Sequence, residues 1–384
     1  MGEAVILEAV RTPIGKRNGA LRAWRPDALY AQVLDALLER TGIDPGLVED
    51  VVTGCVTQVG EQGANVGRLG VLLSRLPKEV PAVSLNRMCG SSQQAVHFAA
   101  QAIAAGDMAF AVAGGVESMT RVPMFSDIGG GFGTLNPELF RRYELVHQGE
   151  SAERIARKYG FSREALDRWG LLSHRRAALA TERGYFRPQM VPLEGLDGEG
   201  RPFLLTRDEG IRPDASLDRM LALKPAFRED GVVTAGNSSQ ISDGAAALLL
   251  GEREKAEALG LKPRARFLAR VVVAGDPTLQ LLEVIPAARK ALERAGLSFK
   301  DLDVIEVNEA FASVVLAFLA ETGADPERVN PLGGAIAHGH PLGATGAVLM
   351  TKLLYELERR GGEFGLQVMC IGHGQATATV IQRI

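Results

Sequence analysis

Two stretches, Leu38-Glu39-Arg40-Thr41-Gly42-Ile43 and Leu292-Glu293-Arg294-Ala295-Gly296-Leu297, carry the same pattern in the two halves of this sequence. The similarity continues without a gap through residues 48–51 and 302–305. Each copy has the features of an amphipathic helix that ends at a glycine, followed by an acidic turn and an apolar strand. Two unrelated helix-to-strand turns can agree by chance, but an ungapped match of this length favours duplication. The sequence therefore predicts two large similar halves, each an α/β unit.

Short apolar segments, most of them followed by helical patterns, recur along the chain. The predicted strands span residues 80–85, 109–113, 304–307 and 367–371. This alternation predicts an α/β fold with buried sheets. At the C-terminus, residues 367–371, a Gly372-His373-Gly374 turn and residues 377–382 predict a β-hairpin.

The stretch from residue 119 to residue 239 differs from both halves. It contains a Gly129-Gly130-Gly131 turn and two charged helical segments, over residues 150–159 and 163–182. Because it has no counterpart in the second half, we predict an inserted subdomain, the kind of element in which substrate specificity is often built. The predicted domains are residues 1–118 plus 240–261, the insertion over 119–239, and a second half over 262–384.

The composition limits the classes of function. Of 384 residues, 46% are hydrophobic and the formal net charge is −3, which argues against disorder and against a nucleic-acid partner. The three cysteines lie far apart and form no Cys-x-x-Cys pair, so we expect neither a disulfide framework nor a metal site. No uncharged apolar run approaches ~18 residues and no basic leader opens the chain, so we expect a soluble cytoplasmic protein without a membrane partner.

Cys89 is the first candidate for chemistry. It stands after a predicted strand and just before a helix that begins near Ser91 and has apolar residues at helical spacing. Free N–H groups and the helix dipole at such a position favour a thiolate, and Gly90 allows a ligand to approach the backbone. These are the features of a nucleophilic cysteine. The commoner alternative is a small buried thiol.

A glycine-rich loop over residues 333–346 contains two of the six histidines, His338 and His340, and precedes a helical pattern over residues 348–357. A histidine fixed in this loop is a candidate base for a cysteine. A phosphate cradle is the alternative, but the loop lacks both the Lys-Ser/Thr ending of a P-loop and a G-x-G-x-x-G motif. No third ligand accompanies the two histidines, which weakens a metal site.

Two further candidates end predicted strands. Asn308 follows the repeated strand and starts a helix, where it could orient a histidine or a water molecule, or simply cap the helix. Cys370 ends the strand before the Gly372 turn, a position at which catalytic side chains are often presented; a buried thiol is again the alternative.

Together, six motifs in this order resemble the thiolase family across nearly the full length of the chain. They are Asn86-Arg87-Met88-Cys89-Gly90-Ser91, Gly114-Gly115-Val116-Glu117-Ser118-Met119, Ala235-Gly236-Asn237-Ser238-Ser239 with Asp243-Gly244-Ala245-Ala246, Asn308-Glu309-Ala310-Phe311-Ala312, Gly339-His340-Pro341-Leu342-Gly343 and Cys370-Ile371-Gly372. The family fold has two βαβαβαββ halves packed in five layers, α-β-α-β-α, with a loop domain inserted in the first half. The resemblance therefore implies an α/β thiolase-like fold, in agreement with the repeat and the insertion.

The resemblance implies an acyltransferase, an acetyl-CoA acetyltransferase or a 3-ketoacyl-CoA thiolase. Cys89 corresponds to the acylated nucleophile, His340 to the histidine that activates it, and Cys370 to a second acid/base. Asn308 corresponds to the residue that holds a water in one oxyanion site, and the backbone N–H groups of Cys89 and Gly372 correspond to the other. The implied reaction cleaves a 3-ketoacyl-CoA with CoA, or runs in reverse as a Claisen condensation.

By the same resemblance, coenzyme A is a co-substrate and no cofactor is needed. His147 lies in the implied substrate-lining stretch, Arg212 matches an arginine near the adenine end of CoA, and Ser239 matches a serine that contacts the pantetheine amide. Dimers and tetramers are usual in the family, so a homodimer or homotetramer is implied.

Four positions depart from the family pattern. His338, His373 and Ala376 replace small or aliphatic residues, and Gln280 replaces a methionine that normally lines the acyl pocket. These changes leave the acyl-chain preference open. We also hypothesise that a protonated imidazole at one of the two new histidines lowers the pKa of a nearby thiol.

Three other functions compete with this interpretation. A ketoacyl synthase shares the fold but lacks the late cysteine, so Cys370 argues against it. A papain-like hydrolase also needs Cys, His and Asn, but its local signature around the cysteine is absent. A CoA- or acyl-CoA-binding paralogue without catalysis is suggested by the four departures and opposed by the intact Cys89, His340, Asn308 and Cys370.

Overall fold

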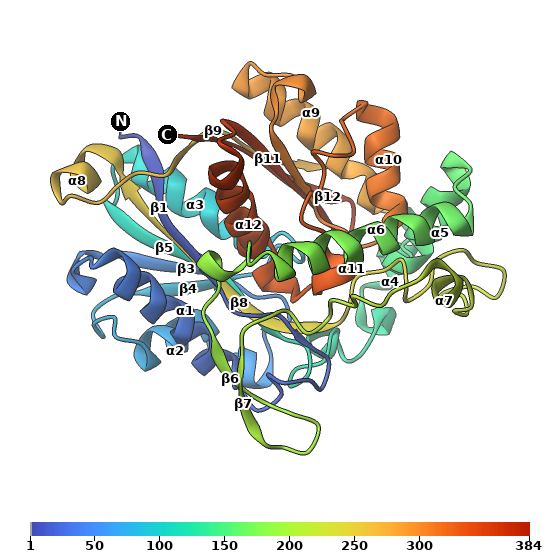
Figure 1. Ribbon diagram of the computed structural model, residues 1–384, viewed down its shortest axis with the longest axis horizontal. Helices are drawn as coiled ribbons and strands as arrows, with labels where there is room; N and C mark the ends of the chain where they lie inside the picture. The colour runs from blue at the N-terminus through green and yellow to red at the C-terminus, as the bar shows by residue number, and fades with distance from the viewer. Residues whose placement is uncertain (1) are drawn as a thin grey trace.

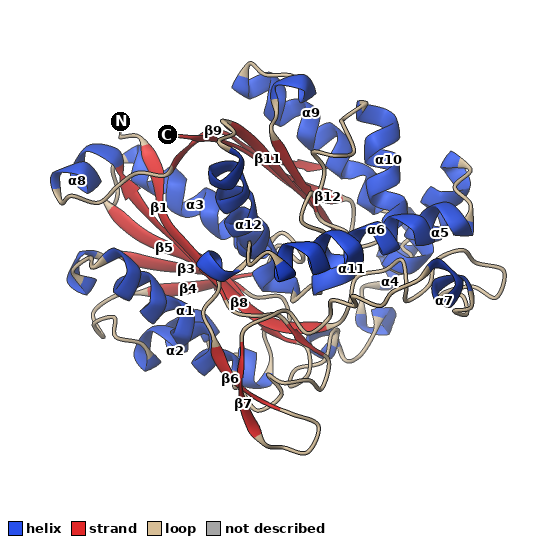
Figure 2. Ribbon diagram, in the orientation of Figure 1, coloured by secondary structure: helices blue, strands red, loops and turns tan. Residues whose placement is uncertain are grey.

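Ten of the strands form one sheet with two arms (Figure 2). The computed structural model describes residues 2–384, and within them the ten strands follow the order β10-β11-β12-β9-β1-β8-β5-β3-β4, with β2 (Gly15–Lys16) paired to β8 outside this path. The first arm contains β1 (Ala4–Arg11), β3 (Asp50–Gly54), β4 (Ala82–Leu85), β5 (Phe110–Ser118) and β8 (Ser242–Glu252). The second contains β9 (Ala265–Ala274), β10 (Val304–Val307), β11 (Phe364–Ile371) and β12 (Gln375–Arg383). The arms join where Val5 and Ile6 of β1 pair with Arg266 and Ala265 of β9.

The two arms repeat one topology, β1-β8-β5-β3 in the first and β9-β12-β11-β10 in the second. In each, two antiparallel pairings are followed by a parallel one. The helices α1 (Pro26–Thr41) and α9 (Val284–Ala295) both stop at a glycine, Gly42 and Gly296, with φ of 64° and 69°. Glycine adopts this left-handed conformation at little cost, which explains the shared stop. The predicted duplication is confirmed.

Three layers of helices separate and cover the two arms (Figure 1). Helices α1 and α2 (Val66–Leu73) cover the outer face of the first arm. Helices α3 (Ser91–Ala105) and α12 (Thr345–Arg360) lie between the arms and contribute to a core that contains residues from both halves. Helices α9 and α10 (Ala312–Thr322) cover the second arm. This is the five-layer α-β-α-β-α arrangement expected from the resemblance.

Burial on both faces explains why the central strands are continuous apolar runs instead of alternating ones. In β8, Leu249 packs into the outer core with α1, whereas Leu248 and Leu250 pack into the core between the arms. All three leucines are 0% exposed. A strand covered by helices on both faces has no solvent side on which polar residues would be favoured.

The long chain segment between β5 and β8 contains helices and a hairpin of its own. The predicted helices over 150–159 and 163–182 are confirmed as α5 (Gln148–Tyr159) and α6 (Arg163–Glu182), and both pack against α10 of the second half. The insertion also holds α4 (Pro137–Arg142), α7 (Leu217–Leu221) and a two-stranded hairpin, β6 (Leu193–Leu196) with β7 (Pro202–Leu205). A buried ion pair, Arg11 Nη1 to Asp208 Oδ1 at 2.7 Å, ties it to β1.

Two short helices complete the chain, α8 (Arg253–Ala258) between the halves and α11 (Ala335–His338) in the glycine-rich loop. The predicted C-terminal hairpin is confirmed, because β11 and β12 pair antiparallel across the turn at residues 372–374. Among the helices of residues 2–384, none is both long enough and apolar enough to cross a bilayer.

Candidate active site

Cys89 lies in a strained turn between β4 and α3. Met88, just before it, has φ 45°, a left-handed conformation that costs a non-glycine residue roughly 1–2 kcal/mol. Gly90 is the N-cap of α3, so Cys89 stands immediately before the helix end, as predicted. Strain of this kind persists where the surrounding fold over-determines it, often at functional sites.

Glycines allow the second half of the chain to approach this turn. A Cβ on Gly90 would collide with the Ile371 side chain of β11. A Cβ on Gly372 would lie 2.9 Å from Gln148 Nε2 and 3.0 Å from Met88 Sδ. The β11–β12 turn therefore packs directly beside Cys89.

His340, Asn308 and Cys370 meet at the same place, at the ends of β10 and β11 and in the loop before α12. The Asn308 amide nitrogen lies 3.4 Å from His340 Nε2 and 3.9 Å from Cys370 Sγ. Asn308 is 0% exposed, and its Oδ1 has no partner within residues 2–384. A buried oxygen of this kind is a site for a water molecule or substrate group.

Thr345 assigns the proton on His340. The threonine hydroxyl donates to Pro341 O at 2.9 Å, so its lone pair accepts from His340 Nδ1 at 2.5 Å. The proton is therefore placed on Nδ1, and Nε2 carries the lone pair that faces Asn308. The basic nitrogen of the ring therefore faces the Asn308 amide, which also lies 3.9 Å from Cys370 Sγ.

Burial favours the uncharged forms of the three titratable groups. It raises the pKa of Cys89 to about 12, assisted by the nearby Cys370 and opposed by the Gln148 amide. It raises the pKa of Cys370 to about 11, with Asn308 acting in the opposite direction, and lowers the pKa of His340 to about 4. The helix end does not overcome desolvation, so the expectation of a resting Cys89 thiolate is wrong.

The hypothesis of a protonated imidazole is also wrong. Burial lowers the pKa of His373, and burial together with Lys352 holds the pKa of His338 well below its usual value. His338 Nε2 lies 3.3 Å from Lys352 Nζ, and Nδ1 lies 2.9 Å from Gly339 O. Neither ring therefore supplies a positive charge to a thiol.

Glu117 holds the loops around the site. Its buried carboxylate accepts from Val56 N at 2.9 Å, Thr57 N at 3.0 Å, Gln62 Nε2 at 2.8 Å and Gly343 N at 2.8 Å. These contacts join the loop after β3 to the loop that carries His340. Because a carboxylate accepts at both oxygens, one side chain satisfies four donors.

A pocket of about 100 Å³ opens beside Cys89. The insertion supplies aromatic groups to it, and Phe132 lies 6.0 Å from the rings of both Phe125 and His373. Gln280 lines the pocket but is occupied: it donates to Ser151 Oγ at 2.8 Å and to Val146 O at 3.1 Å, and accepts from His373 N at 2.8 Å. Ala376 is buried in β12 opposite Cys370.

The three predicted CoA-binding residues lie outside this pocket. His147 caps α5 by accepting from Gly149 N at 3.0 Å, and its ring stacks on Phe227 at 5.4 Å. Arg212 lines a separate cavity of about 240 Å³ with His174 and Arg219. Ser239 donates its N–H to Ala310 O at 2.9 Å, next to the Asn308 turn.

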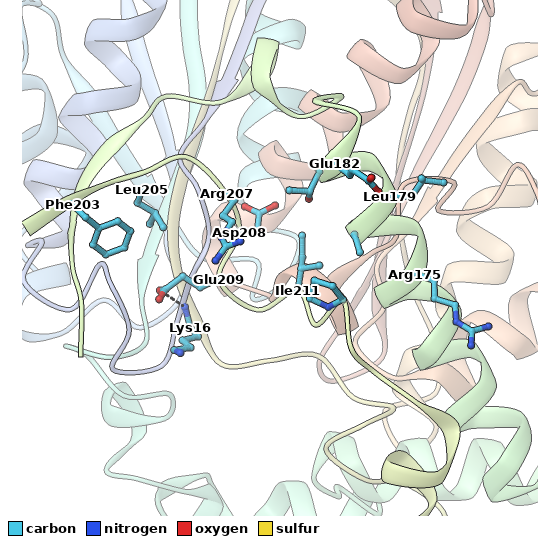
Figure 3. A pocket seen from close by; sticks show the side chains of 13 residues that line it. Lys16, Arg175, Leu179, Glu182, Phe203, Leu205, Arg207, Asp208, Glu209 and Ile211 are labelled. Atoms are coloured by element: carbon cyan, nitrogen blue, oxygen red, sulfur yellow. Dashed lines mark hydrogen bonds between the residues drawn. The ribbon is translucent and has the colours of Figure 1, made fainter. Parts of the chain in front are cut away.

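A larger cavity of about 700 Å³ lies between α6 and the β6–β7 hairpin (Figure 3). Its charged groups, among them Lys16, Arg175, Glu182 and Glu209, come from the insertion and the start of the chain. Neither a cysteine nor a histidine of the described chain lines it. Its size therefore does not make it the reaction centre.

Comparison with known proteins identifies this arrangement. Residues 4–254 match the family description "Thiolase, N-terminal domain" and residues 261–383 match "Thiolase, C-terminal domain". The chain belongs to the thiolase family. As a thiolase it is an acyltransferase, and its mixed α/β fold is the one expected.

Three relatives illustrate the similarity. A steroid 3-ketoacyl-CoA thiolase, FadA6, of Mycobacterium tuberculosis is 47% identical over 100% of this chain and 95% of its own. A 3-oxoadipyl-CoA/3-oxo-5,6-dehydrosuberyl-CoA thiolase of Escherichia coli is 43% identical over 100% of both. The crystal structure of the acetyl-CoA acetyltransferase of Bacillus anthracis superposes with a TM-score of 0.91 at 36% identity, covering 100% of this chain and 99% of that one.

Sequence reasoning missed three residues of the thiolase site: Gln148, Thr345 and Glu117 in its supporting role. Glu117 and Thr345 stand within or next to the motifs Gly114–Met119 and Gly339–Gly343, so their positions carried a signal. Gln148 directly follows His147 of the implied substrate-lining stretch, but nothing in the sequence places it beside Cys89.

Proposed function

We propose that this thiolase cleaves 3-ketoacyl-CoA with free CoA, giving acetyl-CoA and a shortened acyl-CoA, and catalyses the reverse condensation. The observation that carries the proposal is the convergence of Cys89, His340, Asn308 and Cys370 from both halves at one buried point. A paralogue without catalysis would have no reason to keep two uncharged thiols and an oriented base together.

Cys89 is the nucleophile in this proposal. Because thiol and imidazole are both neutral at rest, the Cys89 proton passes to His340 Nε2 as the sulfur attacks the 3-keto carbon. Fixed donors form two oxyanion sites, one with a water held by Asn308 and the other with the backbone N–H groups of Cys89 and Gly372, which stabilise the negative charge of the tetrahedral intermediates and of the acetyl-CoA enolate.

Cys370 completes the reaction as the second acid/base. When the bond between C2 and C3 breaks, the acetyl-CoA enolate carbon takes the Cys370 proton. The resulting thiolate then takes the proton of incoming CoA, whose sulfur attacks the acyl group on Cys89. The Asn308 amide, 3.9 Å from the Cys370 sulfur, favours this thiolate.

CoA lies along the insertion in this proposal, with 119–239 as the binding domain and residues 1–118 plus 240–261 and 262–384 as the two halves. The Arg212 guanidinium forms no ion pair or hydrogen bond within residues 2–384, so it is free to bind an anionic group of the nucleotide end. His147 and Ser239 lie closer to the reacting groups and contact the pantetheine arm. No further cofactor is needed in this proposal, since Cys89, His340 and Cys370 supply the proton transfers.

We propose a homodimer or homotetramer in the cytoplasm. The edge strand β4 supports this, because Val83 is 45% exposed there, flanked by the exposed Leu72, Leu73 and Phe98 of α2 and α3. An exposed apolar edge strand is a template for pairing with a second chain.

The deciding experiment follows thiolysis of acetoacetyl-CoA and of longer 3-ketoacyl-CoAs, with mass spectrometry of the protein. We expect turnover and an acyl adduct on Cys89. Cys89→Ala abolishes both, whereas Cys370→Ala still forms the adduct and does not turn over. Cys55→Ala, the same change at the third buried thiol, retains turnover. The absence of turnover and adduct with every chain length would refute the proposal.

A further inference from the structure

His373 presents an unused polar group to the acyl pocket. It has φ 62°, a left-handed backbone that is unfavourable for residues with a side chain, and the Gln280 side chain secures the turn by accepting from His373 N at 2.8 Å. Neither ring nitrogen of His373 makes a hydrogen bond within the part of the chain that the structure describes, residues 2–384. The centroid of the His373 ring lies 6.0 Å from that of Phe132. This contact orients the His373 ring but provides no hydrogen bond to its nitrogens.

Gln148 adds a second polar group to the pocket lining. Its amide nitrogen would lie 2.9 Å from a Cβ placed on Gly372, and its hydrogen bond to Cys89 opposes the rise in the Cys89 pKa. The lining also contains apolar side chains, among them Phe125, Ile128 and Leu135. The acyl pocket thus combines polar and apolar groups, and a plain alkyl chain leaves the His373 ring nitrogens without a partner. A site with unpaired hydrogen-bonding groups discriminates against ligands that lack a partner for them.

The charge of the pocket selects among polar groups. The residues that line it within 2–384 include no lysine or arginine, and Asp127 contributes a carboxylate. Burial lowers the pKa of His373, which favours the neutral ring. A carboxylate on the acyl chain would lose its water here without gaining a cation.

The volume limits the length of the acyl group. By the benchmark that a protein cavity of about 150 Å³ binds benzene, a pocket of about 100 Å³ holds about four non-hydrogen atoms. This suits a short acyl group with one polar substituent.

We propose that this pocket selects short 3-ketoacyl-CoAs whose acyl end carries a neutral hydrogen-bonding group, such as a carboxamide, hydroxyl or carbonyl, which binds His373 and Gln148. The proposal rests on the thiolase function above and adds the substrate class.

Three substrates of the same shape test it: the 6-carboxamide of 3-ketoadipyl-CoA, 3-ketoadipyl-CoA itself, and 6-methyl-3-ketoheptanoyl-CoA. They end in a neutral polar group, a carboxylate and an apolar group. We expect kcat/KM for the carboxamide to exceed both others by roughly three- to tenfold, the usual contribution of a neutral hydrogen bond. Equal values, or a preference for the carboxylate, would overturn the proposal.

Variants assign the preference to residues. His373→Gly relieves the backbone strain and removes the polar group, so the ratio of carboxamide to isopropyl substrate falls toward one. His373→Asn tolerates the left-handed backbone and keeps an amide, so it retains most of the ratio. Gln148→Met also lowers the ratio, and Thr351→Val on α12 leaves it unchanged. An unchanged ratio in His373→Gly would refute the assignment.

The outcomes separate this inference from the function beneath it. If the protein cleaves acetoacetyl-CoA and forms the Cys89 adduct but shows no preference among the three substrates, the substrate class is wrong and the function stands. If no 3-ketoacyl-CoA is cleaved and no adduct forms, the function itself has failed.

Discussion

Replacing Thr345 by valine should impair catalysis through the proton position on His340. The side chain keeps its shape, but Nδ1 of a ring that is 4% exposed loses its acceptor at 2.5 Å. A buried donor left unsatisfied costs about 1–3 kcal/mol. The ring can avoid that cost by moving the proton to Nε2, which removes the lone pair needed to accept the Cys89 proton.

Both the unsatisfied Nδ1 donor and the shift of the proton to Nε2 should raise the barrier to acylation by up to about 1–3 kcal/mol. At 1.36 kcal/mol for each factor of ten, kcat for acetoacetyl-CoA thiolysis should fall roughly 5- to 150-fold. KM should change less, because Thr345 does not contact the pocket. The assay is steady-state thiolysis together with the rate of acyl-adduct formation on Cys89, which should slow in parallel.

A matched control, Thr351, lies six residues after Thr345 in the same helix, α12. Thr351 is also 0% exposed, and its hydroxyl donates to Ala347 O at 2.8 Å without touching a histidine. Thr351→Val should therefore keep kcat near the parent value, and Thr345→Ser should restore most of the lost activity. If Thr345→Val and Thr351→Val had the same kcat, the tautomer argument would be refuted.

Three other expectations concern stability and assembly. His97 is buried beside Thr379, and burial lowers its pKa to about 3. Below pH 6.5 the imidazole binds a proton in the unfolded chain but not in the folded protein, so the unfolding free energy decreases as pH falls. In His97→Gln, the decrease in unfolding free energy between pH 6.5 and pH 5, measured by urea titration, should be smaller by about 1.5–2 kcal/mol. Glu117→Gln leaves fewer acceptors for four donors and should lower the unfolding free energy by about 2–4 kcal/mol, seen as a lower Tm; an unchanged Tm would contradict the role of this carboxylate. Val83→Lys places a charge on the edge strand β4 and should raise the dimer dissociation constant at least ~10-fold, measured by light scattering across a dilution series; an unchanged mass would exclude this edge as the interface.

Much of the fold could be predicted because its signals are local. The helix–glycine–strand unit around Gly42 and Gly296 depends on propensity, left-handed caps and apolar runs, all of which are readable within about fifteen residues. The placement of Cys89 beside a helix end and of Cys370 at a strand end followed from the same signals. The alternative of a phosphate cradle loses support because His340 of this loop lies 3.4 Å from Asn308, whose amide also reaches Cys370.

The protonation states could not be predicted in the same way. Cys89 stands next to a helix end, which by itself favours a thiolate, yet burial by β11 and the insertion raises its pKa to about 12. Likewise, His338 and His340 are two residues apart, but one ring contacts Lys352 and the other faces Asn308. Only packing decides which ring joins the site.

By itself, the sequence determined the duplicated α/β architecture and the thiolase family, because local patterns and motifs carry that information; it also named Cys89, His340, Asn308 and Cys370 as candidates for the site. The tertiary structure alone decided that burial raises the pKa of both thiols, that Thr345 contacts Nδ1 of His340, and that Gln148 and His373 line the pocket beside Cys89. The reason is physical: a pKa, a tautomer and a pocket wall depend on which groups exclude water and which donors meet, and here those groups come from segments up to some 280 residues apart.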